Sequence, residues 1–171
     1  NLINEVLDLS KIESGKLEIK LESVEVNPVL EQCLSMISTQ ANDKGITLVN
    51  NISDNNYIVS ADSHRLKQVL LNLLSNAVKY NRDNGNITLS AQLTSANRLR
   101  LVVSDTGNGL EQEQIAKLFM PFERLNAPTN IEGTGIGLTI TQNLIEQMKG
   151  SIGVESEIGK GTTFWVELEV H

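Results

Sequence analysis

The sequence has little of three features that mark common classes of protein. It holds a single cysteine in 171 residues, so an internal disulfide bond is impossible, and we expect Cys33 to be a small buried residue in a reducing compartment. Acidic residues outnumber basic ones by 21 to 14, and the net charge of −7 does not suit a nucleic-acid surface. No apolar run approaches the length of a transmembrane helix, and no signal peptide is present. These absences favour a cytoplasmic domain that contacts neither nucleic acid nor a membrane.

The chain begins within a helical pattern. Residues 1–14 carry apolar side chains at helical spacing, and Ser14 and Gly15 end the pattern. The apolar members are Leu2, Ile3, Val6, Leu7, Leu9 and Ile12. Because the pattern is already under way at Asn1, we expect a fragment of a longer protein, and that parent can still be anchored in the inner membrane.

Hydrophobic periodicity along the chain predicts alternating helices and strands around one core. Helices are predicted over residues 1–14, 28–44, 62–81, 111–119 and 139–148, with Asp62 as an N-cap. Strands are predicted over residues 16–26, 46–52, 57–61, 87–93, 99–103, 151–155 and 162–170. Residues 120–132 contain two prolines and little periodicity, so we expect a mobile loop there. This order predicts an α/β two-layer sandwich, with a mixed, mostly antiparallel sheet covered on one face by helices.

Two glycine clusters carry the strongest functional signal. The first, residues 105–110, follows a buried strand, and the second, residues 133–138, runs into a helix. Glycines at a helix start let backbone amides approach an anion, which the helix dipole also favours. A carboxylate that faces such a helix start suits a purine nucleotide, with Asp105 accepting from the adenine amine. Taken alone, Asp105 could equally be an ordinary turn residue at a strand end.

A second signal lies on the predicted helix over residues 62–81. Asn72, Asn76, Lys79 and Tyr80 share one face of it, and apolar residues fill the remainder. Asparagine is a modest helix former, so two of them among leucines need an explanation. The simple one is that neighbouring backbone or water satisfies both amides. The other is that a side-chain carbonyl oxygen binds Mg²⁺.

Five short motifs in this order resemble the ATP-binding catalytic domain of sensor histidine kinases. This family shares the Bergerat fold with gyrase, the mismatch-repair ATPase and a heat-shock chaperone. The motifs span residues 72–80, 105–109, 118–122, 133–137 and 159–164. Each motif is weak alone, but all five at these spacings form a strong signal.

The resemblance implies how the phosphates and the metal of Mg-ATP are held. Asn76 is implied as the Mg²⁺ ligand, with Asn72 beside it on the same face, and Lys79 as a phosphate contact. Arg124 is the candidate for the γ-phosphate, although a lone loop arginine is more often a solvated charge. Backbone amides are implied from the second glycine cluster, at Gly133, Gly135, Gly137 and Leu138.

The resemblance also implies how the base is held. Asp105 is implied to select adenine, because guanine presents a carbonyl where adenine offers an amine. Gly107 and Gly109 would let the backbone approach the base, and Tyr80 would pack against the nucleotide. Thr162 is implied to reach the adenine through water.

Asn72 separates a kinase from a hydrolase. Hydrolytic members of the superfamily place a glutamate four residues before the metal-binding asparagine, where it activates water. Asn72 occupies that position and cannot take a proton from water at neutral pH. Phosphoryl transfer needs positioning and charge neutralisation more than a base, so a kinase is favoured over an ATPase of the gyrase type.

The N-terminal helix resembles part of the same kinase architecture. Residues 1–16 look like the end of the second helix of a dimerisation and phosphoacceptor domain, and residues 17–171 like the catalytic ATP-binding domain. The phosphoacceptor motif itself is missing, because His64 precedes an arginine and His171 ends the sequence. We therefore predict a chain that binds Mg-ATP, or ADP, without phosphorylating itself.

The implied partners follow from that architecture. The γ-phosphoryl group would pass to a histidine of the dimerisation domain, in the same or the sister subunit of a homodimer, and then to the receiver domain of a response regulator. The alternative is a non-catalytic kinase-like module that senses nucleotide or holds a partner.

Overall fold

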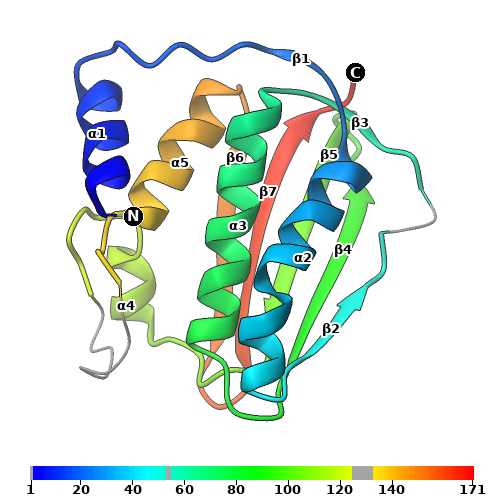
Figure 1. The fold of residues 1–171 in the computed structure, drawn as a ribbon, viewed down its shortest axis with the longest axis vertical. Helices are drawn as coiled ribbons and strands as arrows, with labels where there is room; N and C mark the ends of the chain where they lie inside the picture. Colours follow the sequence, from blue (N-terminus) through cyan, green and yellow to red (C-terminus); the bar gives the residue numbers. More distant parts are fainter. Residues whose placement is uncertain (1, 53–54, 125–132) are drawn as a thin grey trace.

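A five-stranded sheet forms one layer of the molecule, and helices form the other (Figure 1). The computed structural model describes residues 2–52, 55–124 and 133–171. The order of the strands in the sheet is β2-β4-β5-β7-β6. Their bounds are β2 Thr47–Asn50, β4 Asn86–Leu93, β5 Arg98–Asp105, β6 Ser151–Glu157 and β7 Gly161–Glu169. β2 runs parallel to β4, whereas the other neighbours are antiparallel, which confirms the predicted two-layer α/β sandwich.

Three helices cover one face of this sheet: α2 (Val26–Asp43), α3 (Ser63–Lys79) and α5 (Gly137–Gln147) (Figure 1). α3 lies between the other two, and Asp62 caps its start by accepting from the backbone amide of Arg65 at 3.1 Å, as predicted. Its apolar positions recur every three or four residues and are buried: Leu66, Val69, Leu70, Leu73, Leu74, Ala77 and Val78. Burying one leucine contributes about 1.5–3 kcal/mol, so this face fixes the rotation of α3.

The other face of the sheet is not covered by these helices. Along β7 the even-numbered residues are buried, so Trp165 points to the opposite face with its odd-numbered neighbours. The Arg100 guanidinium lies 4.2 Å from the centroid of the Trp165 ring and forms an ion pair with Glu167 at 2.6 Å. The indole lies against Gly153, where any Cβ would overlap it. Trp165 is therefore sheltered on this face, with Val102 of β5 opposite it in the ladder.

The predicted strand over residues 16–26 is largely wrong. Only Glu22–Glu25 form a strand, β1, which pairs with β3 (Ile58–Ala61) in a separate two-stranded sheet. Leu17 and Ile19 alternate because they pack against the core from an unpaired segment. The backbone amide of Lys20 instead donates to the Asp62 side chain at 3.1 Å, so a carboxylate takes the place of a hydrogen-bond partner on a neighbouring strand.

Helix ends also differ from the sequence prediction. α5 begins at Gly137, two residues before the predicted start, and α2 begins at Val26. α4 (Gln112–Lys117) is shorter than predicted, and a capping box between Glu111 and Gln114 starts it. Residues 125–132 of the predicted mobile loop lie outside the described residues.

Helix α1 (Leu2–Glu13) packs beside α5, away from the sheet (Figure 1). Asp8 attaches it to α3 through an ion pair with Arg65 at 3.3 Å and a hydrogen bond from Gln68 at 2.8 Å. Leu9 is buried, but four apolar residues of the same helix are exposed: Leu2, Ile3, Val6 and Leu7. Among the described residues, no helix combines the length and the apolar character needed to cross a membrane.

Candidate functional site

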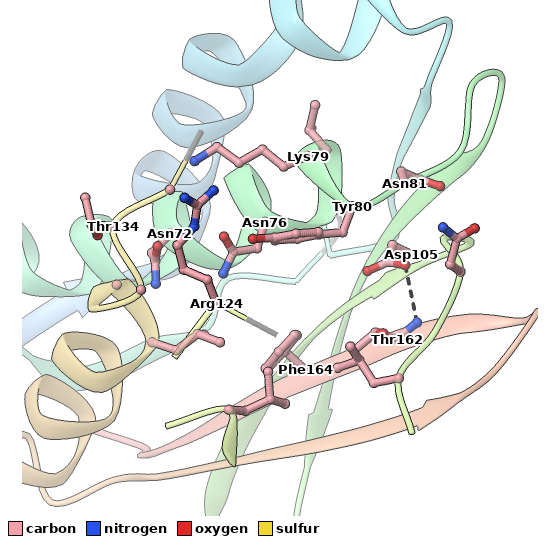
Figure 2. A pocket seen from close by; sticks show the side chains of 18 of the residues that line it. Asn72, Asn76, Lys79, Tyr80, Asn81, Asp105, Arg124, Thr134, Thr162 and Phe164 are labelled. Carbon is pink, nitrogen blue, oxygen red and sulfur yellow. Dashed lines mark hydrogen bonds between the residues drawn. The ribbon is translucent and has the colours of Figure 1, made fainter. Parts of the chain in front are cut away.

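One large cavity opens where α3 ends and α5 begins, and its volume is about 1110 Å³. Figure 2 shows side chains from α3, β5, β7 and the segments around α4 pointing toward it. Twelve of the thirteen predicted site residues line it: Asn72, Asn76, Lys79, Tyr80, Asp105, Gly109, Arg124, Gly133, Gly135, Gly137, Leu138 and Thr162. The thirteenth, Gly107, is not among the lining residues. Segments far apart in sequence thus meet at one cavity of the size that binds a nucleotide.

Asp105 ends β5 and lines the cavity (Figure 2). Its Oδ1 accepts from the backbone amides of Gly107 at 2.8 Å and Thr162 at 3.3 Å. Within the described part of the chain no hydrogen bond reaches Oδ2, which leaves that oxygen for a ligand. Burial raises the pKa of Asp105, and the two backbone hydrogen bonds partly offset this effect.

Glycines allow the backbone to crowd around this carboxylate. A Cβ on Gly107 would overlap the carbonyl oxygen of Tyr80, so Gly107 brings the end of α3 against the Asp105 loop. Gly109, at φ +74°, would likewise overlap the carbonyl oxygen of Glu157 if it carried a side chain. Gly107 therefore shapes the Asp105 end of the cavity indirectly, by holding Asp105 in place.

The start of α5 faces Asn72 of α3. A Cβ on Gly137 would lie 2.7 Å from Asn72 Oδ1, so only glycine permits this approach without a shift. The Asn72 amide donates to the Thr141 hydroxyl at 2.8 Å. Asn72 therefore joins α3 to α5, and the first turn of α5 carries backbone amides that have no partner within the helix. Because the dipole is positive at this end, the arrangement suits a phosphate group.

Asn76 points into the cavity beside Tyr80 (Figure 2). The described residues contain no cluster of three or more histidine, cysteine or acidic side chains that could hold a metal ion. A divalent cation here would take most of its oxygen ligands from phosphates and water, with the Asn76 carbonyl as the ligand from the protein. Mg²⁺ binds in this manner, so the donor set fits a metal that arrives with a nucleotide.

Lys44 was missed by the sequence analysis, although it lines the cavity. Its Nζ donates to the carbonyl oxygens of Val78, Lys79 and Asn81 at 3.0, 3.1 and 3.3 Å. These carbonyls end α3, so the ammonium caps the helix that carries Asn76. No local pattern around Lys44 signals this role, because the carbonyls lie more than thirty residues away in sequence.

Asn81 is buried, and it is a second residue near the cavity that the sequence did not predict. Its amide donates to the carbonyl of Asn86 at 3.0 Å, and its Oδ1 accepts from the Thr106 hydroxyl at 3.1 Å. It thereby ties the end of α3 to the residue that follows Asp105.

The described segments that precede and follow residues 125–132 both line the cavity. Arg124 and Glu123 line it on one side, and Gly133 to Gly135 on the other. The Thr134 hydroxyl donates to Glu5 of α1, so the N-terminal helix contacts this segment directly. Gly135 has φ +75°, and a Cβ there would meet the backbone of Phe122 at 2.9 Å, so this glycine brings the third and fourth motifs together.

Comparisons with known proteins agree on one family. Residues 61–171 match the family model described as "Histidine kinase-, DNA gyrase B-, and HSP90-like ATPase". Sensor protein GacS of Pseudomonas syringae pv. syringae is 38% identical over 99% of this chain, and the match covers 19% of GacS. The adaptive-response sensory kinase SasA of Synechococcus elongatus is 33% identical, with 99% of this chain and 44% of SasA covered. The chain thus spans about a fifth of GacS.

The solved structures agree with this family. Full-length ShkA, crystallised in complex with AMPPNP, is 33% identical with a TM-score of 0.85, over 99% of this chain and 35% of ShkA. ThkA in complex with the response regulator protein TrrA is 24% identical with a TM-score of 0.75, over 98% of this chain and 47% of ThkA, and at that identity it shows a shared fold.

Proposed function

The chain belongs to the family of histidine kinase-, DNA gyrase B- and HSP90-like ATPases, as an ATP-binding catalytic domain of the sensor histidine kinase kind, and we propose that it binds Mg-ATP and donates the γ-phosphoryl group to a histidine. The phosphoacceptor histidine would lie on a dimerisation domain, from which a response regulator receiver domain would take the phosphoryl group. Such a domain would work in the cytoplasm, where ATP is available.

One observation carries the proposal: Asp105, Asn76 and the start of α5 line the same cavity. A carboxylate acceptor at one end suits an adenine amine, and helix amides at the other end suit phosphates. The ribose and the phosphates nearest to it would then lie between these two ends of the cavity.

The chain's own residues would position ATP more than react with it. Lys79 and Arg124 would neutralise phosphate charge, and the amides of Gly137 and Leu138 would orient the terminal phosphates. A Mg²⁺ ion held by Asn76 would supply further neutralisation of phosphate charge. Asn72 supports transfer over hydrolysis, because its amide is bonded to Thr141 and offers no base to a water molecule.

Helix α1 supports a connection to a dimerisation domain. Its exposed apolar residues would be covered if the helix continued into a bundle, as residues 1–16 suggest. We propose that α1 is the end of the second helix of such a domain, in a homodimeric parent.

The test separates binding, hydrolysis and transfer. The chain is titrated with AMPPNP in a calorimeter, with Mg²⁺ or with EDTA. We expect Asn76→Ala to weaken binding about tenfold in Mg²⁺, with a smaller effect in EDTA, because one of the metal's ligands is lost. Asn51→Ala, at an exposed asparagine that follows β2 and does not line the cavity, is the matched control and should leave both affinities unchanged.

Activity is then measured with radiolabelled ATP. Label should pass to a separately supplied dimerisation domain from a relative such as GacS, without steady hydrolysis by the chain alone. Steady hydrolysis would instead support an ATPase, and binding without transfer to any such domain would support a nucleotide sensor. No heat of binding with AMPPNP in Mg²⁺ would refute nucleotide binding itself.

A further inference from the structure

Ser156 lies beside the base end of the cavity without lining it, at the end of β6. It is paired with Thr162 across the β6–β7 ladder, and the two side chains share one face of the sheet. Ser156 is half-buried and Thr162 is buried. Ser156 has no predicted role from the sequence, but its Oγ lies 2.8 Å from the Thr162 hydroxyl oxygen.

The hydrogen bonds of Ser156 can be assigned by counting hydrogens. A serine hydroxyl has one hydrogen to donate and two lone pairs that accept. Ser156 Oγ lies 3.0 Å from the carbonyl oxygen of Gly161, which can only accept, so the serine hydrogen goes there. The Leu110 amide at 2.8 Å can only donate, so it occupies one lone pair.

The remaining contact then has one direction. Ser156 Oγ and Thr162 Oγ1 are 2.8 Å apart, and either oxygen could donate on distance alone. Because Ser156 has already used its hydrogen, Thr162 must donate to it. The Thr162 oxygen is left with lone pairs only, so toward the cavity it can accept a hydrogen bond and cannot give one.

Asp105 adds a second acceptor at the same place. The Thr162 backbone amide donates to Asp105 Oδ1 at 3.3 Å, and both residues line the cavity, so the carboxylate lies beside residue 162 (Figure 2). An ionised carboxylate also only accepts. This end of the cavity therefore presents two acceptors. In direct contact, rather than through the water that the family resemblance implies for Thr162, they suit the amino group at position 6 of adenine and repel the carbonyl oxygen at position 6 of hypoxanthine or guanine.

We propose that Ser156 is a specificity-determining positioning residue, which selects a 6-amino purine over a 6-oxo purine by fixing the Thr162 hydroxyl as an acceptor. This inference rests on the proposed nucleotide binding and extends it to the choice of base. Without Ser156, the Thr162 hydrogen is free to rotate toward the cavity and donate to a carbonyl at position 6. Unpaired polar groups exclude a wrong ligand more strongly than missing contacts do, so this single hydrogen matters for selectivity.

The test compares ATP with inosine triphosphate (ITP), which carries oxygen in place of the 6-amino group. We expect the wild-type chain to bind ATP more tightly, and Ser156→Ala to reduce the ratio of the two dissociation constants by roughly three- to tenfold, the range expected of one neutral hydrogen bond. Ser156→Thr keeps the hydroxyl and should keep the ratio, as the conservative rescue. Thermal unfolding of each variant checks that it is folded.

A purely structural role predicts a different result. General loosening of the β6–β7 turn would weaken ATP and ITP equally, so an unchanged ratio in Ser156→Ala would overturn the inference. Thr162→Val removes the hydroxyl itself, so adding Ser156→Ala to it should change the ratio no further. A further drop in the double variant would also count against the inference. If the wild-type chain bound neither nucleotide, the proposed function itself would fail.

Discussion

Replacing Asp105 by asparagine should reverse the base preference of the site while leaving the fold intact. Both backbone hydrogen bonds to Asp105, from Gly107 and Thr162, end on Oδ1. In Asp105→Asn the side-chain carbonyl must therefore take the Oδ1 position to keep accepting from both amides. The new NH₂ group then occupies the place of Oδ2, where it donates instead of accepting.

The size of the effect follows from the contact that is lost. A hydrogen bond to a charged group contributes about 1.5–3 kcal/mol, so losing it should weaken ATP binding by about ten- to 150-fold. The amide hydrogens also face the hydrogens of the adenine amine, which opposes binding further. ITP gains a donor for its carbonyl, so we expect Asp105→Asn to bind ITP more tightly than ATP.

The pH dependence of the free energy of unfolding gives a second test of the Asp105 assignment. Burial raises the pKa of Asp105, so the folded protein takes up a proton more readily than the unfolded chain. The charge of Asp105 therefore lowers the free energy of unfolding as pH rises through the raised pKa. Asp105→Asn should be at least as stable as the wild type at neutral pH. Protonation of Asp105 should also weaken ATP binding by the wild type. Because the pKa of Asp105 is raised, this loss should begin at a higher pH during acidification than it would for a carboxyl group with an ordinary pKa.

The assays are calorimetry with ATP and ITP in Mg²⁺, and thermal unfolding of both proteins. Unchanged ATP affinity in a folded Asp105→Asn variant would refute the assignment of this carboxylate to the base. A loss of ATP binding with no gain for ITP would contradict the inferred orientation of the amide. A variant markedly less stable at neutral pH would contradict the burial argument.

Two further predictions concern residues outside the base contact. Lys44→Met should lower the free energy of unfolding by about 1–3 kcal/mol in urea titrations, because three carbonyl oxygens at the end of α3 lose their charged donor; an unchanged midpoint would show that water replaces the ammonium at no cost. Cys33 should resist iodoacetamide at pH 8 in the native protein and react in urea, because the thiol is buried and burial raises its pKa to about 11. Rapid labelling of the native protein in mass spectra would contradict that placement.

Local patterns in the sequence predict the elements that build the site. Asp62 is followed by apolar residues at helical spacing, and the structure has α3 with that cap and that buried face. Once the face is fixed, Asn72 and Asn76 can only lie beside each other at the edge of the core. The meeting of the motifs at one cavity was predicted from the family resemblance, whereas the roles of their residues stay predictions.

Contacts between distant residues could not be predicted in this way. Lys44 reaches the end of α3 only because α2 and α3 pack side by side, which no local pattern encodes. Leu17 and Ile19 alternate like a strand, yet they pack on the core with no strand beside them. Alternation reports which side chains are buried, and it does not report whether the backbone has a partner.

The sheltered indole on the open face of the sheet has a practical consequence. Trp165 is the single tryptophan of the chain, and it points away from the helices that border the cavity. Its intrinsic fluorescence should therefore follow global unfolding, when Arg100 leaves the ring, and stay nearly silent when a ligand enters on the other side. Tryptophan fluorescence can thus monitor folding during a titration without a contribution from ligand binding in the cavity.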